Sequence, residues 1–256
     1  MIFTISREVL LQPLSQVVGV VERRQTLPVL ANFMLVARDN RLIVTGTDME
    51  VELISTVLAN VSLEGEITVP ARKLLDIVKA LPDGSNISFS VSDDKATLSA
   101  GRSRFTLSTL PASEFPATDK VEALENIEVS EKSLKRMMDK TSFAMANQDV
   151  RYYLNGLLFD FSDQQLRAIA TDGHRLAICD LESGISINGD RQLIVPRKGV
   201  LELTRMLSDE ADEVTLAIGR NHIRLVKGGT TVTSKLIDGR FPDYKAVVPV
   251  GAVKQM

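Results

Sequence analysis

The spacing of apolar residues along this chain changes between two periods. Short runs in which apolar and polar residues alternate, such as Val51–Leu58, predict strands with one buried face. After Ser130 the spacing becomes helical, and Ser130 itself is the residue type that caps a helix N-terminus. The apolar stripe of this predicted helix consists of Leu134, Met137, Met138 and Phe143. The pattern indicates helices interspersed with many short strands.

The pattern occurs twice. Val69–Leu75 is echoed by Val195–Leu201, and the shared prolines, Pro70 and Pro196, are 126 residues apart. Three further pairs of segments recur in the same order with offsets of 124 or 126: Ile5-Ser6 and Val129-Ser130, Thr47-Asp48 and Thr171-Asp172, Phe115-Pro116 and Phe241-Pro242. We therefore expect two copies of one unit. The predicted domains are 1–120 and 121–245, followed by a stub at 246–256.

Each unit is expected to hold two helices and about eight strands, an α+β fold with helices packed on antiparallel sheets. The first helix follows Ser6 or Ser130, with Pro13 expected to kink the first copy. The second helix is expected to start at Val69-Pro70 or Val195-Pro196, where proline suits the first turn. The expected strands are 2–5, 33–36, 41–45, 51–58, 87–91, 96–99 and 103–109, then 127–129, 156–161, 166–170, 175–179, 214–218, 222–226 and 231–236. The acidic stretch Asp119–Asn126 is the expected linker.

Composition indicates a soluble globular protein. Of 256 residues, 44% are hydrophobic and 25% are charged. No apolar run is long enough to cross a bilayer, and the N-terminus does not resemble a signal peptide. The single cysteine, Cys179, excludes an internal disulfide and a thiolate metal site; it is expected in the core and suits the cytoplasm.

Charge is segregated between helices and the rest of the chain. The four expected helices hold 11 basic and 5 acidic residues, whereas the chain as a whole carries −3. Helices aligned on one face would present a positive track to a polyanion such as DNA. The alternative is that these cations only solvate an exposed helical face.

Motifs for catalysis are missing. The chain has no phosphate-binding loop, no His-Glu-x-x-His segment and no nucleophile elbow. Lys227–Thr230 has a hairpin pattern. Asp172 and His174 could form a catalytic pair, although no nucleophile accompanies them. We expect no enzyme activity, no metal and no cofactor.

One exposed-looking stretch, Gln148–Asn155, combines Gln148, Arg151, Tyr152 and Tyr153 between a helix and a strand. These side chains can contact phosphates and stack on bases. The alternative is a strand that buries one of the two rings.

At this level of detail the sequence closely resembles the bacterial sliding clamp, the beta subunit of DNA polymerase III holoenzyme. The matching segments are 26–30, 46–50, 69–73, 101–105, 148–156, 170–177, 195–199 and 238–244. Family subunits have three such domains, and two subunits form a six-domain ring around duplex DNA. The resemblance implies a processivity factor that tethers the polymerase and contacts DNA without reading its sequence. Its partners would be duplex DNA, the polymerase, the clamp loader and repair proteins, with no membrane.

The resemblance also assigns residues. DNA contacts correspond to Arg24, Gln148, Tyr152 and Tyr153, to which the basic helices add Arg72 and Lys198. The pocket for a short linear peptide corresponds to Arg151, Leu154, Thr171, Gly173, His174, Arg175, Leu176, Pro242 and Val247. Leu154, Leu176, Pro242 and Val247 would form its apolar floor. The alternative for His174 is a hydrogen-bonded turn residue. Ala246 departs from the family, in which a basic residue is common there.

The subunit interface corresponds to Lys73, Arg102, Arg104, Phe105 and Leu107. Alternation along Arg102–Leu107 predicts the arginines on one face and the apolar residues on the other. The chain ends at Met256, where the third domain of the family would begin. Two hypotheses therefore stay open: a clamp that closes a ring, and a two-domain form that binds partner peptides without closing one.

Overall fold

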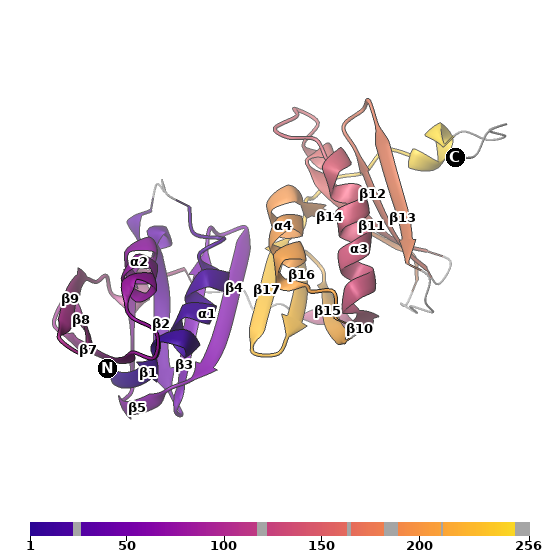
Figure 1. The fold of residues 1–256 in the computed structure, drawn as a ribbon. Coiled ribbons are helices and arrows are strands. Elements are labelled where there is room, and N and C mark those ends of the chain that lie inside the picture. Colours follow the sequence, from indigo (N-terminus) through magenta and orange to yellow (C-terminus); the bar gives the residue numbers. More distant parts are fainter. Residues whose placement is uncertain (23–26, 117–121, 163–164, 182–188, 211, 249–256) are drawn as a thin grey trace.

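The structure is a computed structural model of the whole chain. It describes residues 1–22, 27–116, 122–162, 165–181, 189–210 and 212–248. Within these residues two units of similar construction lie side by side, as Figure 1 shows.

The described residues of the first unit form two α-helices and nine strands. The helices are α1 (Arg7–Val17) and α2 (Ala71–Ala80). The strands are β1 (Ile2–Ser6), β2 (Asn32–Arg38), β3 (Arg41–Thr47), β4 (Val51–Leu58), β5 (Asn60–Leu63), β6 (Gly65–Pro70), β7 (Asn86–Ser92), β8 (Lys95–Ala100) and β9 (Ser103–Ser108).

The second unit repeats this order without a counterpart of β5 in the described residues. Its helices are α3 (Glu131–Thr141) and α4 (Arg197–Met206). Its strands are β10 (Ala123–Ser130), β11 (Gly156–Ser162), β12 (Gln165–Thr171), β13 (Leu176–Leu181), β14 (Arg191–Pro196), β15 (Glu213–Gly219), β16 (His222–Lys227) and β17 (Thr230–Lys235). The predicted tandem α+β architecture is confirmed.

Three antiparallel sheets carry the helices. A five-stranded sheet has the order β5-β1-β7-β8-β9, and a four-stranded sheet has the order β13-β12-β11-β14. Between them, an eight-stranded sheet runs β10-β15-β16-β17-β4-β3-β2-β6 and therefore crosses from one unit into the other. The crossing point is the pair β17–β4, where Thr230 lies opposite Ser55 and Ser234 opposite Val51.

We call the β17–β4 pairing the joint between the units. Because the units repeat, each of its two strands has a counterpart in the other unit. The hairpin β16–β17 pairs Lys227 with Thr230 as the hairpin β8–β9 pairs Ala100 with Ser103, so β9 is the counterpart of β17. By the same comparison β13 is the counterpart of β4. Both β9 and β13 are edge strands, and they lie at opposite ends of the molecule in Figure 1.

Apolar residues of both units form one large buried cluster, since the sheet that crosses the boundary keeps it continuous. In α3 the buried apolar residues are Leu134, Met137 and Met138, as the stripe predicts. Phe143 is different: the helix ends at Thr141, and the Phe143 side chain is 57% exposed. Ser6 and Ser130 cap α1 and α3 by accepting from the backbone N–H of Val9 and Ser133.

Several expectations about element boundaries are wrong. Val69-Pro70 and Val195-Pro196 end strands β6 and β14, and each proline precedes the first helical residue. Strands β5, β6 and β14 were not expected. Part of the expected linker is strand, because β10 begins at Ala123. The helix α1 continues through Pro13, and the expected kink there stays a prediction.

Cys179 is also different from the expectation of a core residue. It is half-buried, at the edge strand β13. Among the described residues, no helix is both long and apolar enough to cross a membrane.

Candidate functional site

The four helices lie on the same side of the sheets in Figure 1 and carry the charge that the sequence concentrates in them. The observed bounds contain the 11 basic and 5 acidic residues expected. The exposed cations of α3 include Lys132, Arg136 and Lys140. This face therefore presents a net positive surface on which phosphates can bind.

Two of the expected DNA contacts on this face are already engaged. Lys198 Nζ lies 2.5 Å from Asp48 Oδ2 and 2.9 Å from Glu22 Oε1, and it donates to Val20 O at 3.2 Å. Burial lowers the pKa of Lys198, but the hydrogen bonds to Asp48 and Glu22 outweigh it and raise the pKa above its usual value. Lys198 thus joins α4 to the first unit as a neutralised cation.

Arg72 is held in the same way, although within its own unit. Its Nη2 donates to Val21 O at 3.0 Å, next to the segment that Lys198 reaches. Both cations therefore fix the backbone that leads into residues 23–26. Arg24, the other expected cation, lies outside the described residues.

The stretch Gln148–Asn155 is a structured loop and not the start of a strand. The Asn155 amide closes it: Asn155 Nδ2 donates to Asp149 O, and Asn155 Oδ1 accepts from Asp149 N, each at 2.9 Å. Gln148 has a positive φ of 55°, and a short 3-10 turn spans Tyr152–Leu154. This closure holds the polar side chains at the surface.

The two tyrosines of this loop have different surroundings. Their rings meet edge to face with centroids 5.7 Å apart. Tyr153 packs against a small apolar cluster, whereas Tyr152 is 55% exposed and Val150 is 96% exposed. Gly239 approaches both tyrosines, because a Cβ there would lie 3.2 Å from Tyr152 Cε2 in the ring and 3.3 Å from Tyr153 Cβ. Tyr152 is the ring available for stacking.

Arg151 reaches from the loop to the turn 171–175. Its guanidinium pairs with Asp149 at 2.8 Å and donates to Asp172 O at 3.2 Å. The side-chain hydrogen bond from Arg151 lowers the pKa of Asp149 to about 2. Gly173 has a φ of +89°, and a Cβ there would lie 2.9 Å from Arg151 Nη1, so this approach requires glycine.

Asp172 organises the turn itself. Its Oδ1 accepts from the backbone N–H of His174 and Arg175, at 2.9 and 3.0 Å, and these bonds lower its pKa. Arg175 binds Asp172 Oδ2 and also donates to Phe143 O. Thr171 Oγ1 donates to Arg175 O at 2.7 Å. These contacts give Asp172 a structural role, and the His174 side chain is exposed beside it.

The residues expected at the floor of the peptide pocket differ in their exposure. Leu154 and Leu176 belong to one apolar cluster whose buried members are Ala146, Leu154, Leu158, Ile169, Ile194, Phe241 and Tyr244. Leu154 is buried and Leu176 half-buried. Pro242 is exposed and Val247 is 67% exposed. The structure therefore brings Arg151, Gly173 and the turn together, while Pro242 and Val247 stand at an open surface.

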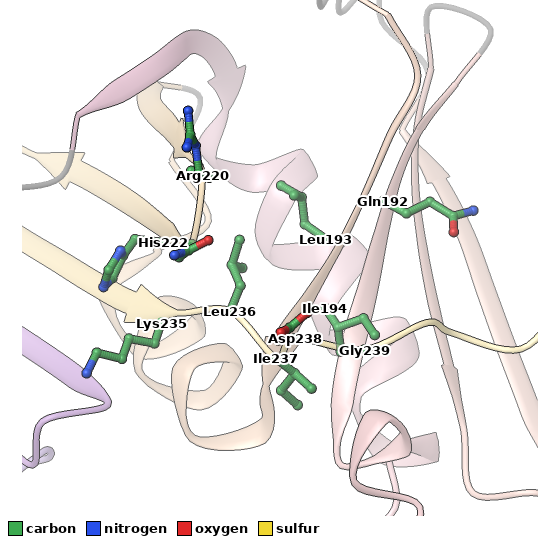
Figure 2. Close-up of a pocket in the computed structure, with 11 residues that line it drawn as sticks. Gln192, Leu193, Ile194, Arg220, His222, Lys235, Leu236, Ile237, Asp238 and Gly239 are labelled. Carbon is green, nitrogen blue, oxygen red and sulfur yellow. The ribbon is translucent and has the colours of Figure 1, made fainter.

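A separate cavity of about 510 Å³ lies on the second unit between β14 and the end of β17. Figure 2 shows Arg220, His222 and Lys235 along one side and the β14 residues Gln192, Leu193 and Ile194 along the other. Its lining contains none of the nine residues expected for the peptide pocket. The residues expected to bind a peptide thus lie outside this cavity.

Four of the five residues expected at a subunit interface lie on or beside the edge strand β9. Arg102 stands in the turn before the strand. Within β9, Arg104 is exposed, whereas Phe105 is half-buried and Leu107 is buried, which fits the expected alternation. Lys73 is exposed on α2.

Sequence reasoning missed two features. The pairing of Lys198 with Asp48 and Glu22 joins residues that are far apart in the sequence, so only the packing of the units brings them together. The Asp149–Asn155 bonds lie within one short loop, where asparagine is a residue type that often bonds nearby backbone groups.

Comparison with known proteins covers nearly the whole described structure. The model of the DNA polymerase III beta subunit N-terminal domain matches residues 1–119, and that of its central domain matches residues 128–243. The beta sliding clamp of Pseudomonas aeruginosa is 54% identical over 253 residues, which are 98% of this chain and 69% of the relative. That of Escherichia coli strain K12 is 46% identical over 255 residues, 99% of this chain and 69% of the relative.

Solved structures agree. The DNA polymerase III subunit beta from Pseudomonas aeruginosa superimposes with a TM-score of 0.95 at 52% identity, covering 98% of this chain and 69% of that one. A sliding clamp from the same organism bound to griselimycin gives a TM-score of 0.93 at 54% identity, covering 98% of this chain and 68% of that one.

Proposed function

The chain belongs to the family of DNA polymerase III beta subunits, the beta sliding clamps, and we propose that it surrounds duplex DNA and docks partner proteins. In this role it performs no catalysis of its own. It tethers a DNA polymerase topologically and lets it slide.

The observation that carries the proposal is the joint β17–β4 and its two open counterparts. Inside the chain, β17 and β4 join two units into one sheet. The counterparts β9 and β13 have the same strand directions and stand open at opposite ends. Open edges of this kind bind further strands. Repetition of the joint between copies generates a head-to-tail assembly, and three copies supply the six units of the family ring.

The internal joint predicts the register between copies. Thr230 lies opposite Ser55, and their hydroxyl oxygens are 3.1 Å apart. The counterparts of these residues are Ser103 in β9 and Cys179 in β13. A copy-to-copy joint therefore places Ser103 of one chain beside Cys179 of the next.

The positive helical face supports DNA as the occupant of such a ring. Exposed cations on α3 and the exposed Tyr152 ring suit contacts that hold phosphates without reading bases. We propose Gln148, Tyr152 and Tyr153 as DNA contacts on the loop, together with Arg24 and cations of the helices.

Peptide docking is proposed at Arg151, Leu154, Leu176 and the turn 171–175, with Pro242 and Val247 at its rim. A relative bound to griselimycin supports a ligand-binding surface in this family. The exposure of Val247 favours a second candidate function, in which this chain binds partner peptides without closing a ring.

The experiment uses the variant Ser103→Cys. Under oxidation it should form a disulfide with the native Cys179 of a neighbouring copy, because the side chains of the equivalent internal pair touch. The matched control is Ser108→Cys, which is exposed on the same strand but has no cysteine opposite it in this register. Oxidation on a nicked circular plasmid should give complexes that resist high salt until the plasmid is linearised.

Cross-linked species that leave linear DNA but stay on circles support the clamp. A chain that stays monomeric by light scattering at every concentration, with no cross-link from Ser103→Cys, rejects ring closure by this chain. Peptide binding without a ring would then be the function that stands.

A further inference from the structure

A buried carboxylate begins helix α3, far from the surfaces described above. Glu131 is fully buried, and its Oε1 accepts from Lys227 Nζ at 2.6 Å, from Ser208 Oγ at 2.6 Å and from Ser208 N. Its second oxygen, Oε2, is buried and has no hydrogen-bond partner in the described structure. An ionised oxygen left this way is costly to bury.

Two exposed carboxylates face this group from the segment before β15. One carboxylate oxygen each from Glu131, Glu210 and Asp212 lies within 4.8 Å of the others. The backbone holds the arrangement, since Glu131 N donates to Asp212 O at 2.9 Å. Burial raises the pKa of Glu131, but hydrogen bonds from Lys227 and Ser208 outweigh it and lower the pKa, so the group is ionised at neutral pH.

The charges of this cluster do not balance. Three carboxylates face one ammonium group, that of Lys227, which leaves an excess of two negative charges. Lys135 also interacts electrostatically with Glu131, but Asp209 pairs with Lys135 at 3.0 Å, so this pair leaves the excess unchanged. The excess equals the charge of one divalent cation.

We propose that Glu131, Glu210 and Asp212 bind one hard divalent cation, with Ca²⁺ as the preferred ion. Oxygen ligands at about 2.3–2.6 Å from Ca²⁺ stand up to about 5 Å apart, which matches the spacing of the three carboxylates. The smaller Mg²⁺ needs ligands closer together and keeps more of its water. The ion would offset the excess charge of the three carboxylates and join the first turn of α3 to the segment before β15.

The site is a property of this chain's second unit and not of the repeated fold. The counterpart of Glu131 in the first unit is Arg7, which donates to Val78 O and Lys79 O and pairs with Asp83 at 2.7 Å. A cation side chain in one unit thus occupies the position of an anion in the other. The proposal does not depend on ring closure or on DNA binding.

Equilibrium dialysis of the full chain against radioactive Ca²⁺ tests the site directly. We expect one ion per chain with a dissociation constant on the order of 0.1–1 mM, because two of the three ligands are exposed. Glu210→Gln and Asp212→Asn should each weaken binding at least tenfold. Glu213→Gln is the matched control, since it removes the same charge from an exposed neighbour outside the cluster.

Glu213→Gln should therefore bind Ca²⁺ as the unchanged chain does. An equal loss in Glu213→Gln and Glu210→Gln would overturn the site, because it would show only diffuse attraction by an acidic segment. Absence of saturable binding up to 10 times the expected constant would overturn it as well. These substitutions are at exposed positions and should leave the fold intact, and circular dichroism of each variant checks this.

Discussion

Lys198 in α4 and Asp48 in the turn between β3 and β4 form an ion pair of 2.5 Å across the boundary of the two units. The Asp48 side chain is only 7% exposed, and Lys198 also contacts Glu22 and Val20 O of the first unit. A residue that the sequence suggested as a DNA contact therefore ties one unit to the other. The pair stabilises the contact between the two units.

Lys198→Ala should weaken this boundary. It leaves the Asp48 carboxylate buried without its cation, and we expect the free energy of unfolding to fall by about 1–2 kcal/mol, a range reduced for the partial exposure of Lys198. Urea titration followed by circular dichroism measures the change. Lys132→Ala, an exposed lysine of α3, should change stability by no more than about 0.5 kcal/mol. Equal effects of the two variants would show that the Lys198–Asp48 ion pair does not stabilise the boundary.

DNA binding should depend on the exposed cations of α3 and not on Lys198, which is the reverse of the order expected for stability. Arg136 is exposed on α3, so its replacement by alanine should reduce the slope of log K against log salt by about 0.9, the value for one phosphate contact. Lys198→Ala should leave that slope unchanged, because Asp48 and Glu22 already neutralise it. Fluorescence anisotropy with duplex DNA between about 50 and 200 mM salt measures both. A slope reduced only in Lys198→Ala would reverse the assignment.

Leu176→Asp should abolish binding at the proposed peptide pocket. Leu176 is half-buried against the apolar cluster of Leu154 and Tyr244, and a carboxylate there would face an apolar ligand without a partner. We expect affinity for griselimycin to fall at least tenfold, measured by calorimetry. Ile178→Asp is the control, since Ile178 is 38% exposed two residues along the same strand. Normal binding by Leu176→Asp would show that the pocket lies elsewhere.

Much of the fold follows from local patterns in the sequence. The repeat, the caps at Ser6 and Ser130 and the strand Val51–Leu58 depend on residue type and spacing alone, and these were predicted. Strands β6 and β14 were not, because their apolar residues run directly into the prolines that precede α2 and α4. Phe143 was placed on the helix because its spacing fits, whereas the helix ends two residues earlier.

The candidate site was predictable only where its contacts join residues close together in the sequence. The hydrogen bonds of the turn 171–175 and of the loop around Asp149 join residues two or three positions apart, so a short stretch of sequence is enough to predict them. The engagement of Lys198 and the open position of Val247 depend on how distant segments pack. The excess charge around Glu131 likewise arises from residues that are far apart in the sequence, so the spacing of residues along the chain does not predict it.

Glu202 gives the boundary between the units a dependence on pH. Its side chain is 4% exposed, and a Cβ on Gly19 of the first unit would lie 2.5 Å from its Oε2. Burial raises the pKa of Glu202 above its usual value of 4.5, against the opposing effects of Arg205 and Lys198 and together with the smaller effect of Asp48. The neutral form is therefore the one that the fold prefers.

The raised pKa of Glu202 sets the direction in which stability changes with pH. A carboxyl group with a raised pKa contributes stability that is complete below the unfolded value of 4.5 and is lost as the pH rises through the folded value. Glu202→Gln, which cannot ionise, should therefore be more stable than the unchanged chain at pH 7, and the difference should vanish below pH 4.5. Urea unfolding at several pH values measures this difference, with the exposed Glu66→Gln as control. A loss of stability in Glu202→Gln at pH 7 would mean that the 2.6 Å ion pair with Arg205 outweighs burial.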